Sequence, residues 1–410
     1  MKIVHINFSD TKGGASIAVK RIHNLLLKNN IDSKIVVSEK TEDNSNVFSI
    51  NKTSEIIKNT IKSSISRQLK RVFKTENKNT HSLNIISSKN LELVNSLKPD
   101  YVNLHWIGNE TISMSDINKI NSKIVWTLHD MWPFCGAEHY TYDLRYTQGY
   151  TKDNRPAYEK GFDVNKFVWK KKLRYFKKVE KIICTSKWMY NCVKNSYLFK
   201  DKQILEIPLT LNSEIWKPFE KEYARNFFNI KLESTVVLYG ADNYLKNRRK
   251  GFSLFKKAIS AFKKNYQQEI TVILFGTNEL NQKEIQSDFK DIKVLNLGKI
   301  GDEHLLRLVY SCSDLMVIPS LLEAFGLTAL ESIYCGIPCV VFENTGLTSI
   351  IDHKQNGYVA KYESIEDLTT GIDWCLKNLK NKNNLIHEKA ITNFNSHAIL
   401  QKYIEFLKKE

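Results

Sequence analysis

Short apolar runs alternate with longer amphipathic stretches along most of the chain. The opening run KIVHINF is followed by a glycine-containing loop and then by Ile17, Ile22, Leu25 and Leu26 at helical spacing. Further runs of strand length stand at 35–37, 101–106, 123–130, 181–186 and 204–208. Strand runs that alternate with helical stretches predict a doubly wound parallel sheet.

A second series of apolar runs follows the first. These runs stand at 235–240, 270–276, 292–298, 314–319 and 338–342. The stretch 208–218 between the two series shows no apolar periodicity and is interpreted as a hinge. A length of 410 residues also favours two domains over one.

The pattern therefore predicts an α/β protein with two Rossmann-like domains. The first is expected at residues 1–208, completed by a C-terminal helix at 396–410, and the second at residues 209–395. Both sheets are expected to turn their carboxyl ends toward a central cleft, because open α/β sheets bind ligands at that edge.

Composition narrows the function classes. The chain has 61 Lys and Arg against 44 Asp and Glu, a net charge of +17 that favours anionic partners. The seven cysteines are odd in number and form no C-x-x-C pair, so neither a disulfide framework nor a zinc site is indicated. The apolar run at the start is too short for a signal peptide, and no run of eighteen apolar residues occurs. We expect a soluble or peripheral, cytoplasmic protein.

The segment from Pro319 to Ser332 carries the most informative chemistry. Glu323 lies in a loop after the apolar run DLMVIP, and a helix is expected to start near Gly326. The free N–H groups at a helix start can hold a diphosphate. Glu331 lies about 7.5 Å farther along the helix axis. One carboxylate could reach sugar hydroxyls and the other a ribose, although two such glutamates taken alone are more often solvated surface.

With seven residues between Glu323 and Glu331, the sequence resembles the family-4 retaining glycosyltransferases of the GT-B fold. Their signature is E-x7-E after an apolar strand that ends in Pro-Ser. The stretch 334–338 follows where that family commonly has A-x-G-x-P. The resemblance extends to Gly13-Gly14-Ala15, to the segments 127–132 and 185–188, and to Arg249-Lys250-Gly251.

The resemblance implies a donor site in the second domain. Glu323 would contact the donor sugar, Glu331 would contact the ribose, and the backbone at Phe325-Gly326-Leu327 would hold the phosphates. Lys250, with Arg249 beside it, would neutralise the leaving diphosphate. The family usually has an arginine about six residues before this lysine, but position 244 is Tyr. Lys246, Arg248 and Arg249 are the candidate substitutes.

The resemblance also implies roles in the first domain. Gly13 and Gly14 would let the backbone approach the diphosphate from the opposite side. His129 would act beside the reacting sugar, although a histidine in this position can also be a buried structural residue. The aromatic-rich loop that follows contains the candidate acceptor contacts Trp132, Glu138, His139 and Tyr140. Packing of this loop against its own domain remains an open alternative.

Two stretches are rich in Lys and Arg, at Lys166–Lys181 and at Asn51–Lys78. Both are predicted to form amphipathic basic helices, and Trp169, Leu173 and Phe176 would pack inward in the first. Such a helix either presents a solvated face or docks on anionic lipid.

The sequence therefore predicts a retaining glycosyltransferase that moves a sugar from a nucleotide-diphosphate donor to a glycan or lipid-linked glycan acceptor. A subset of the family with a similar segment after His129 assembles surface polysaccharides such as O-antigen, capsule or exopolysaccharide. No metal and no cofactor are expected, since no D-x-D pair stands at a strand exit. One alternative is a nucleotide-sugar epimerase of the same fold. Another is a nucleic-acid-binding protein, which only the charge suggests and no binding motif supports.

Overall fold

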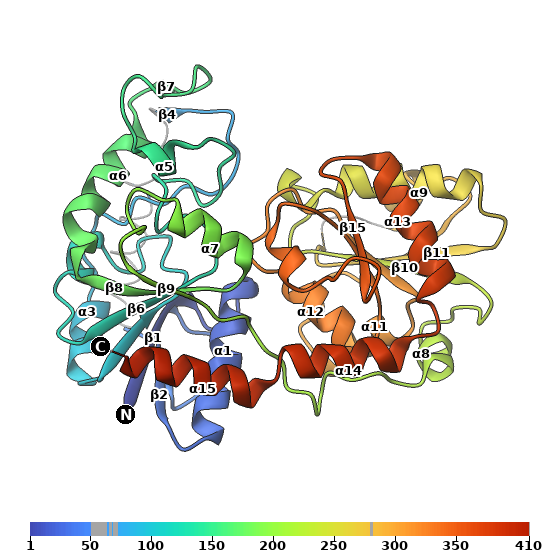
Figure 1. Cartoon of the computed structure of the whole chain (residues 1–410), viewed down its shortest axis with the longest axis horizontal. Coiled ribbons are helices and arrows are strands. Elements are labelled where there is room, and N and C mark those ends of the chain that lie inside the picture. Colours follow the sequence, from blue (N-terminus) through green and yellow to red (C-terminus); the bar gives the residue numbers. More distant parts are fainter. Residues whose placement is uncertain (51–63, 65–67, 69–72, 279–281, 410) are drawn as a thin grey trace. The chain divides into compact units, whose positions relative to one another are not determined.

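The computed structural model describes residues 1–50, 64, 68, 73–278 and 282–409 (Figure 1). The chain divides into two compact units. The first unit is Met1–Pro208 with Leu400–Glu410, and the second is Leu209–Ile399.

The first unit is built on a parallel sheet with the strand order β3-β2-β1-β5-β6-β8-β9. Its strands are β1 (Lys2–Ser9), β2 (Asp32–Glu39), β3 (Val47–Phe48), β5 (Tyr101–Leu104), β6 (Lys123–Leu128), β8 (Val179–Cys184) and β9 (Gln203–Glu206). Its helices are α1 (Gly13–Lys28), α3 (Asn90–Ser96), α4 (Met114–Ile117), α5 (Arg145–Gln148), α6 (Val164–Tyr175), α7 (Lys187–Lys194) and α15 (Ser396–Lys408). Helix α15 starts in the second unit. The first unit also contains a 3₁₀ turn, η1 (Phe176–Lys178). A short antiparallel pair joins β4 (Phe73–Lys74) to β7 (Lys160–Gly161).

The second unit repeats this architecture with the strand order β12-β11-β10-β13-β14-β15, again parallel throughout. Its strands are β10 (Thr235–Gly240), β11 (Ile270–Phe275), β12 (Lys293–Asn296), β13 (Leu315–Ile318), β14 (Cys339–Phe342) and β15 (Gly357–Ala360). Its helices are α8 (Lys221–Phe227), α9 (Phe252–Lys264), α10 (Gln282–Ser287), α11 (Glu303–Ser311), α12 (Leu327–Tyr334), α13 (Ile365–Asn378) and α14 (Asn383–Asn393), with 3₁₀ turns η2 (Arg248–Lys250) and η3 (Gly346–Ser349).

Central strands are mostly buried, as expected when helices cover both faces of a sheet. Every residue of β10 and of β11 is buried. Such a strand reads as a continuous apolar run, which is why the sequence located both sheets. The structure confirms the predicted α/β fold with two parallel sheets.

The C-terminal helix α15 packs on the first unit from Leu400 onward. Asn103 on β5 donates a hydrogen bond from its amide to the Tyr403 hydroxyl, at 2.9 Å. Lys181 on β8 donates from Nζ to the carbonyls of Phe406 and Leu407, at 3.0 and 2.8 Å. A lysine at this position satisfies carbonyls that the last turn of a helix leaves free.

The basic stretches are only partly as predicted. Helix α6 ends at Tyr175, and its buried face is Val164, Asn165, Val168, Trp169 and Lys172, whereas Leu173 is half-buried. Trp169 and Phe176 are thus buried as predicted, whereas Leu173 is only partly so and Lys172 is fully buried. Its Nζ donates to the carbonyls of Cys135 and Gly136 at 3.1 and 2.6 Å and lies 3.8 Å from the centre of the Trp132 ring.

Most of Asn51–Lys78 lies outside the described residues, so the helix predicted there has no structural counterpart to report. Among the residues that the structure describes, no helix is long and apolar enough to cross a membrane.

A row of histidines crosses the first unit's sheet. His5 is on β1, His105 directly follows β5, and His129 directly follows β6. These strands are neighbours in the order β1-β5-β6, so the three side chains meet. His5 Nδ1 lies 2.9 Å from His105 Nε2, and His105 Nδ1 lies 3.0 Å from His129 Nε2. His23 on α1 lies nearby, with its ring centre 6.5 Å from that of His5 and its Nδ1 2.7 Å from Ser33 Oγ.

Burial keeps these histidines neutral. It lowers the pKa of His5 to about 3, and the neighbouring His23 adds to the decrease. Burial likewise lowers the pKa of His23 to about 4, and the nearby Lys34 ammonium adds to the decrease. In the unfolded chain these imidazoles bind a proton below pH 6.5. Their contribution to stability is therefore present above pH 6.5 and is lost as the pH falls toward 4.

We predict a steep acid destabilisation that depends on the buried histidines. Between pH 7 and pH 5 the protonation of unfolded His23 alone should lower the free energy of unfolding by about 2 kcal/mol. Urea titrations at the two pH values should show that His23→Gln removes this part of the loss. The exposed His304→Gln should behave as the wild type does. An equal loss in all three proteins would contradict the assignment.

Candidate functional site

The second unit brings two loops together at the carboxyl ends of β10 and β13, which are neighbours in the sheet. The loop after β10 ends in η2, and the loop after β13 runs from Pro319 to Gly326. Leu321 N–H donates to the carbonyl of Arg249 at 2.7 Å, and Arg249 Nη1 donates to the carbonyl of Leu322 at 2.5 Å. The Tyr239 hydroxyl donates to the carbonyl of Lys250 at 3.0 Å. The two loops are thus fixed to each other within one unit.

Gly251 allows this approach. Its φ is +71°, a conformation that side chains disfavour. A Cβ at this position would lie 1.8 Å from the carbonyl oxygen of Pro319. Because no side chain fits there, the glycine sets how close Lys250 comes to the loop after β13.

The two loops bring together three charged side chains. Lys250 Nζ lies 2.5 Å from Glu323 Oε2, and Arg249 Nη1 lies 3.6 Å from the same oxygen. The Lys250 and Glu323 side chains are only 18% and 12% exposed. The cluster therefore contains two cations and one carboxylate, which leaves a net positive charge in a partly desolvated place.

Burial and ion pairing compete in setting the protonation of this cluster. Burial by itself raises the pKa of Glu323, but Lys250 and Arg249 outweigh it, and the net effect is a lowered pKa. Burial lowers the pKa of Lys250, and the Glu323 carboxylate opposes that decrease. Glu323 is therefore held ionised.

Helix α12 begins next to this cluster. Gly326 is its N-cap residue, with φ +107°, and it has no side chain to cap the helix. The first turn, Leu327-Thr328-Ala329, contains no acidic residue. The first N–H groups of a helix have no partner within the helix and lie at the positive end of its dipole. Phe325 is buried and faces the Phe394 ring at 6.3 Å, so this residue can offer only backbone to a ligand.

Glu331 lies on the first turns of α12 and is only 4% exposed. Its Oε2 accepts a hydrogen bond from the Tyr310 hydroxyl on α11, at 2.9 Å. Glu323 and Glu331 therefore belong to the same β13–α12 segment, but they lie in different surroundings. Glu323 pairs with cations, whereas Glu331 pairs with a neutral hydroxyl.

Tyr244, at the position where the resemblance leads one to expect an arginine, is buried in an aromatic cluster. Its ring centre lies 4.5 Å from that of Phe252 and 5.2 Å from that of Tyr239. Of the substitutes considered from the sequence, Arg249 reaches Glu323, whereas Lys246 and Arg248 are exposed.

The first-unit candidates lie at strand exits. Gly13 and Gly14 are exposed and open helix α1, and Gly13 has φ +82°. His129 is half-buried at the end of β6, with its Nε2 bonded to His105. Burial lowers the pKa of His129 to about 4, although the Asp130 carboxylate opposes the decrease. His129 is therefore a neutral imidazole near pH 7.

The four candidate acceptor contacts are all buried, as in the alternative that this loop packs against its own unit. They are Trp132, Glu138, His139 and Tyr140. His139 Nδ1 lies 2.5 Å from Asp130 Oδ2, and its Nε2 lies 2.8 Å from Ser82 Oγ. Most of their polar side-chain atoms bond to protein groups, whereas Glu138 Oε2 is buried without a hydrogen-bond partner among the described residues.

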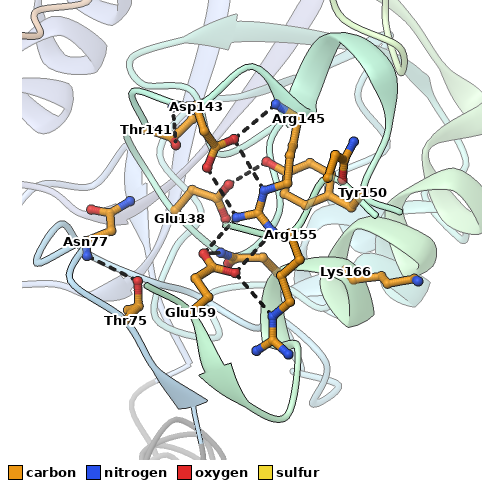
Figure 2. A network of polar contacts seen from close by, with 12 residues as sticks. Thr75, Asn77, Glu138, Thr141, Asp143, Arg145, Tyr150, Arg155, Glu159 and Lys166 are labelled. Carbon is orange, nitrogen blue, oxygen red and sulfur yellow. Dashed lines mark hydrogen bonds and ion pairs between the residues drawn. The ribbon is translucent and has the colours of Figure 1, made fainter. Parts of the chain in front are cut away.

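Glu138 belongs to a buried polar network that organises the loop before α6 (Figure 2). Its carboxylate accepts a hydrogen bond from the Tyr150 hydroxyl. Arg145 donates to both oxygens of Glu159, at 3.1 and 2.7 Å, and to Asp143. Burial raises the pKa of Glu138 to about 7, and the Tyr150 hydroxyl opposes the increase. The network indicates a structural role for this loop.

Sequence reasoning missed His5, His105 and Lys172. The two histidines stand inside apolar runs, KIVHINF and YVNLHW, and a polar residue in such a run is the signal that could have found them. Lys172 carried no signal, because it is one of many lysines in its stretch. Within the described part of the chain, no group of three or more His, Cys, Asp or Glu could hold a metal ion.

Most of the second unit matches a known protein family. Residues 225–391 match the family described as Glycosyl transferases group 1. An uncharacterized glycosyltransferase of Methanocaldococcus jannaschii is 38% identical over 81 residues, which is 20% of this chain and 20% of that protein. The chain spans only 20%, 36% and 29% of the lengths of the first three curated relatives it matches.

Solved structures match the whole chain. WaaG, a glycosyltransferase involved in lipopolysaccharide biosynthesis, aligns with a TM-score of 0.65 at 13% identity over 100% of both chains. HepE of Anabaena, in complex with UDP-glucose, aligns with a TM-score of 0.64 at 14% identity over 99% of both chains. The chain therefore has the fold of GT-B glycosyltransferases, and its residues 225–391 match the group 1 family of glycosyl transferases.

Proposed function

We propose that the protein is a family-4 retaining glycosyltransferase that transfers a sugar from a nucleotide-diphosphate donor to a glycan or lipid-linked glycan. The observation that carries this proposal is the cluster of Lys250, Arg249 and Glu323 beside the uncapped start of α12. This cluster lies within the segment that matches the group 1 family. The match supports a glycosyl transferase, while the retaining mechanism and the E-x7-E reading of Glu323 and Glu331 are our proposal.

The cluster suits a diphosphate leaving group. The free N–H groups at Leu327 and Thr328 would receive phosphate oxygens, and Lys250 and Arg249 would offset the charge that develops as the bond to the sugar breaks. Glu323 holds Lys250 in place before the donor binds, and its second oxygen would accept a hydrogen bond from a sugar hydroxyl. We include no metal in this mechanism, because the two cations carry the charge that a metal would otherwise supply.

The pathway is proposed from the relatives. WaaG is described as involved in lipopolysaccharide biosynthesis, and HepE was solved with UDP-glucose. We propose a nucleotide-sugar donor and a role in surface polysaccharide assembly at the inner face of the cytoplasmic membrane. The roles of Gly13, Gly14 and His129 in the first unit remain predictions. The relatives reported above support neither the epimerase alternative nor the nucleic-acid-binding one.

The function is tested by transfer of sugar from UDP-, GDP- and ADP-sugars to glycan acceptors, in buffer containing EDTA. The wild type should transfer, and Lys250→Ala should lose on the order of 10²-fold in turnover, because it removes a charge that faces the leaving group. Lys257→Ala is the control, since it removes an equal but exposed charge on α9. Loss of transfer in EDTA, restored by Mg²⁺ or Mn²⁺, would contradict the metal-free mechanism. Full activity of Lys250→Ala would exclude this lysine from the site.

We predict that the two glutamates have separable effects. Glu331→Gln should weaken nucleotide binding, since a carboxylate accepts from ribose hydroxyls better than an amide. The amide oxygen can still accept from Tyr310, so the fold should be kept. Glu323→Gln should instead lower turnover and leave nucleotide affinity within a few-fold. Calorimetry and initial rates measure the two quantities.

Tyr310→Phe is the control for this pair, because it removes the hydroxyl and leaves both carboxylates. If Tyr310→Phe weakened nucleotide binding as much as Glu331→Gln did, the weaker binding would result from altered packing between α11 and α12 and not from a lost contact with the ribose. Equal effects of the two glutamate variants on affinity and turnover would contradict the assigned roles.

We predict salt-sensitive binding of the first unit to anionic lipid. Lys170, Arg174 and Lys177 are exposed on α6 and η1 and present a basic surface. The protein should sediment with vesicles that contain phosphatidylglycerol at 0.1 M salt and be released at 1 M, since the Debye length falls from about 10 Å to about 3 Å. Replacing the three by Gln should abolish binding without unfolding.

The charge-matched control replaces Lys257, Lys264 and Lys290 of the second unit, which are also exposed. An equal loss of vesicle binding in the control would show that net charge alone drives adsorption. In that case the membrane part of the proposal should be dropped.

A further inference from the structure

His5, His105 and His129 are bonded in one direction along the row. Each bond joins Nδ1 of one ring to Nε2 of the next, at 2.9 Å between His5 and His105 and at 3.0 Å between His105 and His129. Consecutive ring centres are 5.1 and 5.2 Å apart. One nitrogen is left over at each end of the row, Nε2 of His5 and Nδ1 of His129.

A neutral imidazole has one N–H donor and one acceptor nitrogen. If all three rings are neutral, only two arrangements of hydrogens satisfy both bonds. Either every ring carries its hydrogen on Nδ1, or every ring carries it on Nε2. Any mixture places two hydrogens or two lone pairs in one bond. The tautomer of His129 is therefore tied to that of His5 on a strand two positions away in the sheet.

The buried end of the row selects between these arrangements. Nε2 of His5 is buried and has no hydrogen-bond partner among the described residues. A buried N–H without an acceptor is the rarer kind of unsatisfied group. The arrangement with hydrogens on Nδ1 leaves only a lone pair at that end, so it is favoured. His129 then carries its hydrogen on Nδ1.

Neighbouring groups hold the row in place and keep it neutral. His105 N–H donates to the carbonyl of Ile6 at 2.9 Å, and the carbonyl of His105 accepts from Trp126 Nε1 at 3.0 Å. Burial lowers the pKa of His105 well below its usual value, and His5 and His129 add to the decrease. The charged or titratable groups that face the row are Asp130 next to His129, His23 next to His5, and Lys34 next to His23. The Asp130 carboxylate is already bonded to His139 and to the N–H of Trp132.

We propose that His105 and His5 are positioning residues that fix His129 as the neutral Nδ1–H tautomer, so that His129 offers a hydrogen-bond donor to a sugar oxygen. His129 is half-buried, and its Nδ1 has no partner within the described part of the chain. It would act as a donor and not as a general base. The sugar as its target rests on the proposed function, whereas the tautomer does not.

Nitrogen NMR of the full chain labelled with ¹⁵N-histidine tests the tautomer directly. At pH 7 we expect His5, His105 and His129 each to show a pyrrole-like Nδ1 and a pyridine-like Nε2, with signals assigned by their loss in His→Gln variants. A pyrrole-like Nε2 on His129, or a charged His129 at pH 7, would overturn the proposal. This measurement needs neither donor nor acceptor.

A variant separates positioning from packing. His105→Leu removes both bonds of the row, so His129 should change from one tautomer to a mixture, and turnover should fall by about 10-fold or more. The affinity for nucleotide, which we place in the second unit, should not change. His23→Leu is the control, because it removes a buried histidine outside the row, and it should leave the His129 signals unchanged.

The outcomes distinguish this inference from the proposed function. If His105→Leu leaves the His129 tautomer as it is in the wild type, the positioning role is wrong. If the wild type transfers no sugar from any donor while the NMR pattern is as expected, the proposed function fails and the tautomer assignment stands.

Discussion

The carbonyl of Pro319 comes so close to Gly251 that no side chain fits between them. This contact exists because β10 and β13 are neighbours in a parallel sheet, which brings their exits to the same edge. This close contact fixes the bonds between the two loops. It also sets the distance of 2.5 Å between Lys250 Nζ and Glu323 Oε2 and places this pair beside the start of α12. On an open surface the side chains of this charged cluster could move apart. Here the backbone geometry holds them together.

The same arrangement explains why the proximity of Lys250 and Glu323 to the start of α12 could be predicted from the sequence. Glycines, a lysine before a glycine, and glutamates around a helix start are local signals, and a parallel sheet brings strand exits together without further information. The fold could also be predicted from local signals, because strands covered on both faces are continuous apolar runs such as TVVLYG and ITVILF.

The residues that the sequence did not reveal depend on contacts between distant segments. His5 and His105 are 100 positions apart, and Lys172 reaches carbonyls 36 to 40 positions before it. Helical periodicity placed Leu173 on the buried face of α6, but the lysine beside it found three carbonyls and an aromatic ring, which can compensate for the loss of water. The burial of the loop after His129 has a related cause, because His139 bonds to Asp130 and Arg145 bonds to Glu159.

The bonds from Lys181 to the end of α15 have a consequence for how the chain acquires its structure during translation. The ribosome makes β8 more than 200 residues before Phe406 and Leu407, so Lys181 lacks these carbonyl partners until the second unit has been synthesised. Until then Lys181 lacks the helix that covers it, and the Asn103 amide lacks the Tyr403 hydroxyl as a partner. The last helix acts as a closing element that completes the first-made unit after the later one has emerged.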